Sequence, residues 1–143
     1  DLTGRENVYL NGAMLGFTRK QIDARFDQII EFAELQDFID APLRTYSSGM
    51  EARLGFAVAT DQRPDILIVD EILGVGDEAF QQKCLDRILG FSHQGTTILL
   101  VSHSAEMIEA ICGRVAWLDH GHLVGLGPAS EMILRYHESQ NLG

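Results

Sequence analysis

Two adjacent carboxylates, Asp70 and Glu71, follow directly after the apolar run at residues 66–69. The run contains only isoleucine, leucine and valine, which predicts a buried, parallel β-strand. Open α/β sheets bind their ligands beyond the carboxyl ends of such strands. There, one carboxylate can bind Mg²⁺, directly or through water, and its neighbour can polarise an attacking water. For an isolated acidic pair, the alternative is a strand that ends in an exposed turn.

A serine-glycine segment lies upstream of these acids, in the run Tyr46-Ser47-Ser48-Gly49-Met50. A helical pattern follows it, so Ser47, Ser48 and Gly49 are predicted to open a helix. The first N–H groups of a helix point outward and carry partial positive charge, which favours a phosphate. The alternative is a plain N-cap, since Ser48 and Glu51 match a capping box. Both interpretations can hold, because a cap fixes the helix end that meets the anion.

A histidine, His103, follows a second apolar run at residues 97–101. Its imidazole, neutral or charged near pH 7, can hydrogen-bond a phosphate group. A histidine satisfied within the core is the usual alternative for a lone histidine. The position directly after a predicted strand favours the functional interpretation.

The elements that must position these groups change character along the chain. The pattern of residues 1–60 predicts helices. Two capping-box patterns, Thr3 with Glu6 and Thr18 with Gln21, predict where two of these helices begin. The remainder reads as alternating strand and helix. Its last part shows a hairpin pattern over residues 114–126, followed by a helix that starts at Pro128.

The composition narrows the classes of protein that remain. The chain has 143 residues, about the size of one domain, and 45% of them are apolar, as in a globular protein with a core. A formal net charge of −10 argues against nucleic acid as a partner, because phosphates need a basic face. Cys84 and Cys112 form no CxxC pair, so we expect two reduced thiols in a cytoplasmic protein.

The order of these segments resembles the second half of an ABC-type ATPase domain, and the resemblance covers almost the whole chain. Residues 46–50 look like the signature motif, residues 66–71 like Walker B, residues 74–77 like the D-loop, and His103 like the switch histidine. The implied fold is α/β, a P-loop NTPase-like ABC ATPase core that is incomplete. It comprises a helical signature subdomain at residues 1–60 and the C-terminal half of the core at 61–143.

The resemblance implies ATP and Mg²⁺ as cofactors, with a role for each matching residue. Asp70 would hold Mg²⁺, Glu71 would be the general base, and His103 would contact the γ-phosphate. Ser47, Ser48 and Gly49 would meet the γ-phosphate of nucleotide held by a second ATPase subunit. Asp77 would be the D-loop aspartate that bridges the two subunits. Met50 replaces the usual signature glutamine, which puts the hydrogen bond of that amide in doubt.

The sequence contains no G-x-x-x-x-G-K-[ST] loop, the segment with which such ATPases hold phosphates. Its two lysines, Lys20 and Lys83, lie in helical contexts. We therefore interpret the chain as the C-terminal portion of a longer ATPase, or as a half-domain that needs a complementing segment. We expect exposed strand edges, an unpaired apolar face and no measurable ATPase activity from residues 1–143 alone.

The opening of the chain points to a subfamily. Residues 2–12, together with 74–81 and 84–85, are similar to ATPase subunits of polysaccharide exporters that move O-antigen, capsular polysaccharide or teichoic-acid precursors. The resemblance implies a homodimer on the cytoplasmic face of the inner membrane, bound peripherally to an export permease. One alternative is a non-catalytic half-domain that docks onto a permease or an intact ATPase. Another is an ATPase of a different ABC subfamily, against which the acidic charge counts.

Overall fold

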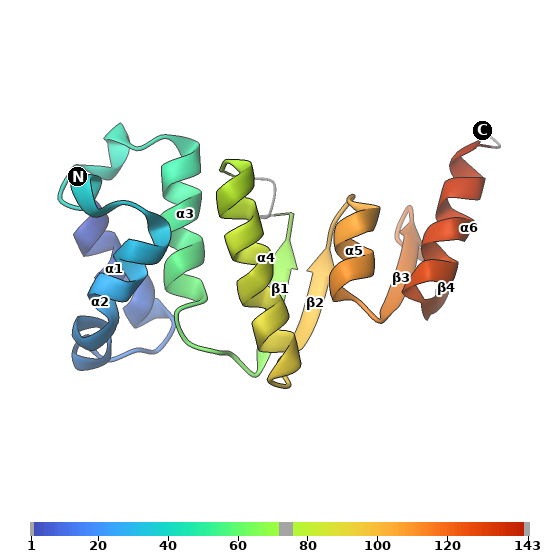
Figure 1. Ribbon diagram of the computed structural model, residues 1–143, viewed down its shortest axis with the longest axis horizontal. Coiled ribbons are helices and arrows are strands. Elements are labelled where there is room, and N and C mark those ends of the chain that lie inside the picture. Colours follow the sequence, from blue (N-terminus) through green and yellow to red (C-terminus); the bar gives the residue numbers. More distant parts are fainter. Residues whose placement is uncertain (1, 72–75, 142–143) are drawn as a thin grey trace. The chain divides into compact units, whose positions relative to one another are not determined.

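The computed structural model describes residues 2–71 and 76–141, which form two compact units. The first, here called the helical unit, is built from residues up to Pro64 and from the described residues of 76–91. The second, here called the strand unit, is built from Asp65–Glu71 and the residues from Ser92 onward. Figure 1 shows the order of their elements along the chain.

Three α-helices and two short 3₁₀ turns make up most of the helical unit: α1 (Gly4–Met14), α2 (Arg19–Ala33), η1 (Gln36–Phe38), η2 (Leu43–Thr45) and α3 (Ser48–Ala59). Both predicted capping boxes are confirmed. The Thr3 hydroxyl accepts the backbone N–H of Glu6, and Thr18 does the same for Gln21, while each N3 side chain bonds back to its cap. These local hydrogen bonds determine where α1 and α2 begin.

The core of the helical unit is an apolar stripe on α2, packed against α1 and α3. Its buried members include Val8, Ile22, Phe26, Ile29, Ile30, Ala33, Leu54, Ala57 and Val58. Burying a side chain of this kind stabilises the fold by about 1.5–3 kcal/mol. The stripe therefore holds α3, and with it the serine-glycine segment, in a fixed place within this unit.

Helix α4 (Glu78–His93) begins in the helical unit and buries Phe80, Cys84, Ile88 and Phe91. Phe80 packs edge-on against Phe32 of α2, with 5.7 Å between ring centroids. The guanidinium of Arg87 lies 3.4 Å above the centre of the same Phe32 ring. Most of α4 therefore belongs to the helical unit, although the predicted division at residue 60 places it in the C-terminal half of the core. That division describes domains of the whole ATPase fold, and it stays a prediction.

The strand unit contains the two predicted strands, β1 (Ile66–Asp70) and β2 (Thr97–Val101), which pair in parallel with Asp70 opposite Val101. The expectation that β1 is buried is wrong for most of its length. Val69 is 3% exposed, but Ile66 and Ile68 are each 66% exposed. Side chains alternate between the two faces of a strand, and within this unit nothing described covers the face that carries Ile66 and Ile68. The expected apolar face is therefore present.

The rest of the strand unit consists of α5 (Ala105–Ile111) and a hairpin with a helix against it: β3 (Arg114–Asp119), β4 (His122–Pro128) and α6 (Ala129–Asn141). The hairpin confirms the prediction. Pro128 ends β4 instead of opening the last helix, because it pairs with Arg114. Tyr136 of α6 packs edge-on against Trp117, with centroids 5.7 Å apart. Among the described helices, none combines the length and apolar character needed to cross a lipid bilayer.

Candidate functional site

The serine-glycine segment opens α3, as predicted, but the cap lies one residue earlier than the capping-box pattern indicated. Ser47 is the N-cap, and its Oγ accepts the backbone N–H of Met50 at 3.1 Å. The predicted Ser48–Glu51 box is wrong because the helix already includes Ser48. The first intrahelical bond runs from the Glu51 N–H to the Ser47 carbonyl, so the amides of the first turn point along the helix axis toward its open end.

Tyr46 anchors the chain immediately before this cap. Its ring is buried, and its hydroxyl donates to the carbonyl oxygen of Phe38 at 2.7 Å. Burial raises the pKa of the Tyr46 phenol. Gly4 of α1 lies so close that a methyl group on it would sit 2.1 Å from the Tyr46 hydroxyl oxygen. The residue that precedes the cap is thus held by packing from α1 and by one hydrogen bond.

Glu71 and His103 meet at the carboxyl ends of the two parallel strands. The Glu71 N–H donates to the carbonyl of Val101 at 3.1 Å, and the backbone then turns at φ 47°, an uncommon value for a residue with a side chain. The turn places Glu71 Oε1 3.0 Å from His103 Nε2. Both side chains are exposed, so this contact contributes little to stability. The contact matters for chemistry, because it places a carboxylate and an imidazole side by side.

Two serines fix the turn that presents His103. The Ser104 N–H donates to Ser102 Oγ at 3.1 Å, and Ser104 Oγ in turn accepts the Met107 N–H at 3.2 Å as the N-cap of α5. Hydrogen bonds of Ser102 and Ser104 therefore hold the backbone on both sides of His103.

Asp70 is the last residue of β1, exposed at the same strand end. Its carboxylate and that of Glu71 supply oxygen donors, the ligand type that Mg²⁺ takes alongside phosphate oxygens. Within residues 2–71 and 76–141, no group of three or more His, Cys, Asp or Glu side chains is placed to hold a metal ion. The oxygen donors of Asp70 and Glu71 are of the type that fits a magnesium ion bound together with phosphate oxygens.

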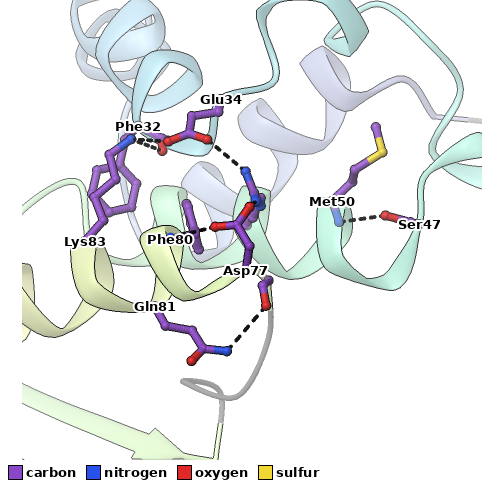
Figure 2. A network of polar contacts seen from close by, with 10 residues as sticks. Phe32, Glu34, Ser47, Met50, Asp77, Phe80, Gln81 and Lys83 are labelled. Carbon is purple, nitrogen blue, oxygen red and sulfur yellow. Dashed lines mark hydrogen bonds and ion pairs between the residues drawn. The ribbon is translucent and has the colours of Figure 1, made fainter.

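Asp77 caps the start of α4 and forms an ion pair with α3 (Figure 2). Its Oδ1 accepts the Phe80 N–H at 2.9 Å, and its Oδ2 lies 2.6 Å from Nη2 of Arg53. The Phe80 amide, and then the Arg53 guanidinium, lower the pKa of this carboxyl. Gly76, which precedes it, has φ +95°, a value that favours glycine. Gly74 and Val75 of the predicted D-loop lie outside the described residues.

The predicted site residues fall into two groups. Ser47, Ser48, Gly49 and Asp77 lie in the helical unit, whereas Asp70, Glu71 and His103 lie in the strand unit. Sequence reasoning missed Arg53, which contacts Asp77. The signal for it was an arginine on the same predicted helix as the serine-glycine segment, without any hint of which acid it would pair with.

This combination of fold and strand-end chemistry agrees with the comparison to known families. The model of the ABC transporter family matches residues 1–74, just over half of the chain. The chain belongs to the ABC transporter family.

Individual relatives with similar sequences are ATP-binding proteins named for O-antigen or teichoic acid export. The chain is 51% identical over 139 residues to the O-antigen export system ATP-binding protein RfbB of Klebsiella pneumoniae, and the match covers 97% of this chain and 56% of that protein. It is 52% identical over 136 residues to the teichoic acids export ATP-binding protein TagH of Enterococcus faecalis, covering 95% of this chain and 30% of the relative. The chain thus spans about half, or less, of the length of these relatives.

Solved structures agree with the fold. The structure of an ATP-binding subunit of an ABC transporter superposes with a TM-score of 0.82 at 20% identity, covering 96% of this chain and 57% of that one. A dimeric bacterial ABC transporter cassette superposes with a TM-score of 0.72 at 22% identity, covering 90% of this chain and 57% of the other. The expected fold class, an incomplete ABC ATPase core, is confirmed.

Proposed function

We propose that this chain forms part of an ATP-hydrolysing ABC subunit that drives export of a lipid-linked polysaccharide such as O-antigen or a teichoic-acid precursor. Relatives named for O-antigen and teichoic-acid export, at 51% and 52% identity, support the transport class. The observation that carries the chemistry is the 3.0 Å contact between Glu71 and His103 at the end of the parallel strand pair.

Three residues of the strand unit, Asp70, Glu71 and His103, would each have a separate role at the phosphate. Bound MgATP supplies the phosphoryl group, and Asp70 would hold the metal ion. The Glu71 carboxylate orients the attacking water and accepts its proton as general base. The imidazole of His103 lies beside the same carboxylate and would donate an N–H to it or to a phosphate oxygen, and to both at once only as the imidazolium. The braced turn at Ser102 and Ser104 keeps that donor in place.

The helical unit would act on the nucleotide of a partner. Ser47, Ser48 and Gly49 open α3 with outward amides, which can bind a γ-phosphate held by a second ATPase subunit. Asp77 would bridge the two subunits. A solved dimeric cassette with the same fold supports this arrangement. An export permease would be the membrane partner, and the ATPase would lie peripherally on the cytoplasmic face of the inner membrane.

A second candidate is a non-catalytic half-domain that docks onto a permease or an intact ATPase. The observation that favours it is the lack of a G-x-x-x-x-G-K-[ST] loop in these 143 residues. ATP binding by residues 1–143 alone, measured by calorimetry, separates the chain's own contribution from that of a complementing segment. We expect no measurable hydrolysis from this stretch, and turnover by it would contradict the need for a phosphate loop.

The decisive experiment is steady-state ATP hydrolysis by the full-length protein carrying Glu71→Gln. Loss of the general base is expected to lower kcat by roughly 100-fold or more, with ATP still bound. Glu109→Gln is the matched control, because Glu109 is an exposed glutamate on α5 that takes no part in the site. If Glu71→Gln hydrolyses ATP as fast as this control, Glu71 is not the base and the proposal fails.

A further inference from the structure

Arg53 forms two ion pairs and an aromatic contact within the helical unit. Its Nη1 lies 3.0 Å from Oε2 of Glu34, and its Nη2 lies 2.6 Å from Oδ2 of Asp77. Its guanidinium also covers the Phe80 ring, 4.7 Å from the ring centroid, and its side chain is 16% exposed. Figure 2 shows its two acidic partners, Glu34 at the end of α2 and Asp77 at the start of α4.

Asp77 is held at both of its oxygens. Oδ2 pairs with Arg53, while Oδ1 accepts the backbone N–H of Phe80 as the cap of α4. A carboxylate with both oxygens engaged cannot rotate freely. Its direction therefore follows the position of the Arg53 guanidinium, and hence of α3.

The other end of the bridge is equally fixed. Glu34 follows α2 in a left-handed conformation, with φ 58°, and its Oε1 accepts from Nζ of Lys83 at 2.9 Å. Lys83 also donates to the carbonyl of Phe32 at 3.0 Å. Because Lys83 belongs to α4, the ion pairs close a ring through α2, α3 and α4. Such a ring leaves Arg53 little freedom to release Asp77 while the helices stay packed.

We propose that Arg53 is a positioning residue that couples the phosphate-facing end of α3 to Asp77. This inference rests on the proposed function, in which Ser47, Ser48 and Gly49 meet the nucleotide of a second subunit. A helix is a stiff rod, so movement of its first turn against a phosphate is carried to Arg53 in its second turn and on to Asp77. The contact thus connects the helix end that would meet the partner's nucleotide with Asp77, the residue proposed to bridge the two subunits.

The consequence is kinetic. Losing Arg53 should slow turnover and weaken cooperativity between the two ATP sites, while ATP affinity changes little, because no residue of the bridge is assigned to this subunit's own nucleotide. A merely structural role would instead lower the melting temperature and leave the kinetic pattern alone.

A double-mutant cycle on the full-length protein with its permease tests the coupling. The variants are Arg53→Gln, Asp77→Asn and the pair; Asn keeps an oxygen for the Phe80 amide and removes only the charge. We expect each single variant to lower kcat roughly three- to tenfold, with KM within about twofold of wild type and a lower Hill coefficient, since a charged hydrogen bond is lost. The double variant should be no slower than the slower single one, since both remove one contact.

Two further variants keep the test decisive. Glu34→Gln weakens the ring at its other end but leaves the direct Arg53–Asp77 pair in place, so its kcat should fall clearly less than that of Arg53→Gln. Arg53→Lys keeps a cation but has only one nitrogen for two carboxylates, so its kcat should fall between wild type and Arg53→Gln. It also serves if Arg53→Gln does not fold.

The outcomes separate this inference from the proposed function. If wild type hydrolyses ATP and Glu71→Gln does not, the proposed function stands. Multiplying losses in the double variant, or a Glu34→Gln loss equal to that of Arg53→Gln, would then overturn the role of Arg53. If wild type hydrolyses no ATP, the proposed function and the inference both fall.

Discussion

Replacing Gly4 by alanine should disturb the residue that precedes the α3 cap. Gly4 is buried at the start of α1. An added methyl carbon would stand 2.1 Å from the Tyr46 hydroxyl oxygen and 2.9 Å from the carbonyl oxygen of Ile39. The hydroxyl is at the far end of a side chain and can move, but the carbonyl belongs to the backbone. The variant can therefore fold only if Tyr46 gives up its bond to Phe38 and the backbone shifts.

The cost follows from these contacts. Overpacking a tight site costs about 1–3 kcal/mol. The lost Tyr46 hydrogen bond adds about 0.5–1 kcal/mol, the lower part of the usual range, because the Phe38 carbonyl still accepts the Ala41 N–H at 2.9 Å. The higher helix propensity of alanine offsets at most about 1 kcal/mol of this loss in the free energy of unfolding. We expect a net loss of roughly 2 kcal/mol in the free energy of unfolding.

Urea unfolding followed by far-ultraviolet circular dichroism measures this loss. Gly55→Ala is the matched control, because Gly55 lies exposed within α3 and an added methyl group there meets nothing within 4 Å. That variant should gain up to about 1 kcal/mol. Tyr46→Phe removes the closest atom, so Gly4→Ala in that background should cost about 1 kcal/mol less than in wild type.

The reasoning fails if Gly4→Ala and Gly55→Ala change stability in the same direction. It also fails if Tyr46→Phe does not reduce the cost of Gly4→Ala, since the clash would then not involve the hydroxyl.

Two further predictions concern titrating groups. Burial raises the pKa of the Cys84 thiol to about 11. At pH 8 only about one thiol in a thousand would then be ionised, so a thiol reagent should label Cys112 first in the native protein and both cysteines in urea. The Lys83 and Arg53 contacts lower the pKa of Glu34 below its unfolded value, so their stabilisation is complete above about pH 5 and is lost as the pH falls. Melting temperatures should therefore drop less between about pH 5 and about pH 3 for Glu34→Gln than for wild type, and equal drops would contradict this.

Local hydrogen bonding explains which parts of the fold could be predicted. The Thr3–Glu6 cap depends on residues three apart, so its pattern is visible in sequence, and the structure has it. The meeting of Glu71 and His103 was also predictable in outline, because both follow apolar strands and parallel strands end at one edge. The cap at Ser47 was missed by one residue because two adjacent serines offer the same chemistry, and only the helix start distinguishes them.

Other features depend on packing between distant segments. Arg53 and Asp77 are separated by 24 residues, and they meet because the start of α4 packs against α2 and α3 through Phe80, which contacts Phe32 and Arg53. The exposure of Ile66 could not be read from its apolar type, since burial depends on what covers a strand and not on the strand itself.

The sequence by itself determined where α1 and α2 begin and which two segments form the parallel strands, because capping hydrogen bonds and strand patterns depend on residues close together in the chain. Only the tertiary structure decided that Arg53 holds Asp77 and that Tyr46 is pressed between Gly4 and Phe38. Those contacts arise when helices pack, and packing joins residues whose separation along the chain carries no signal.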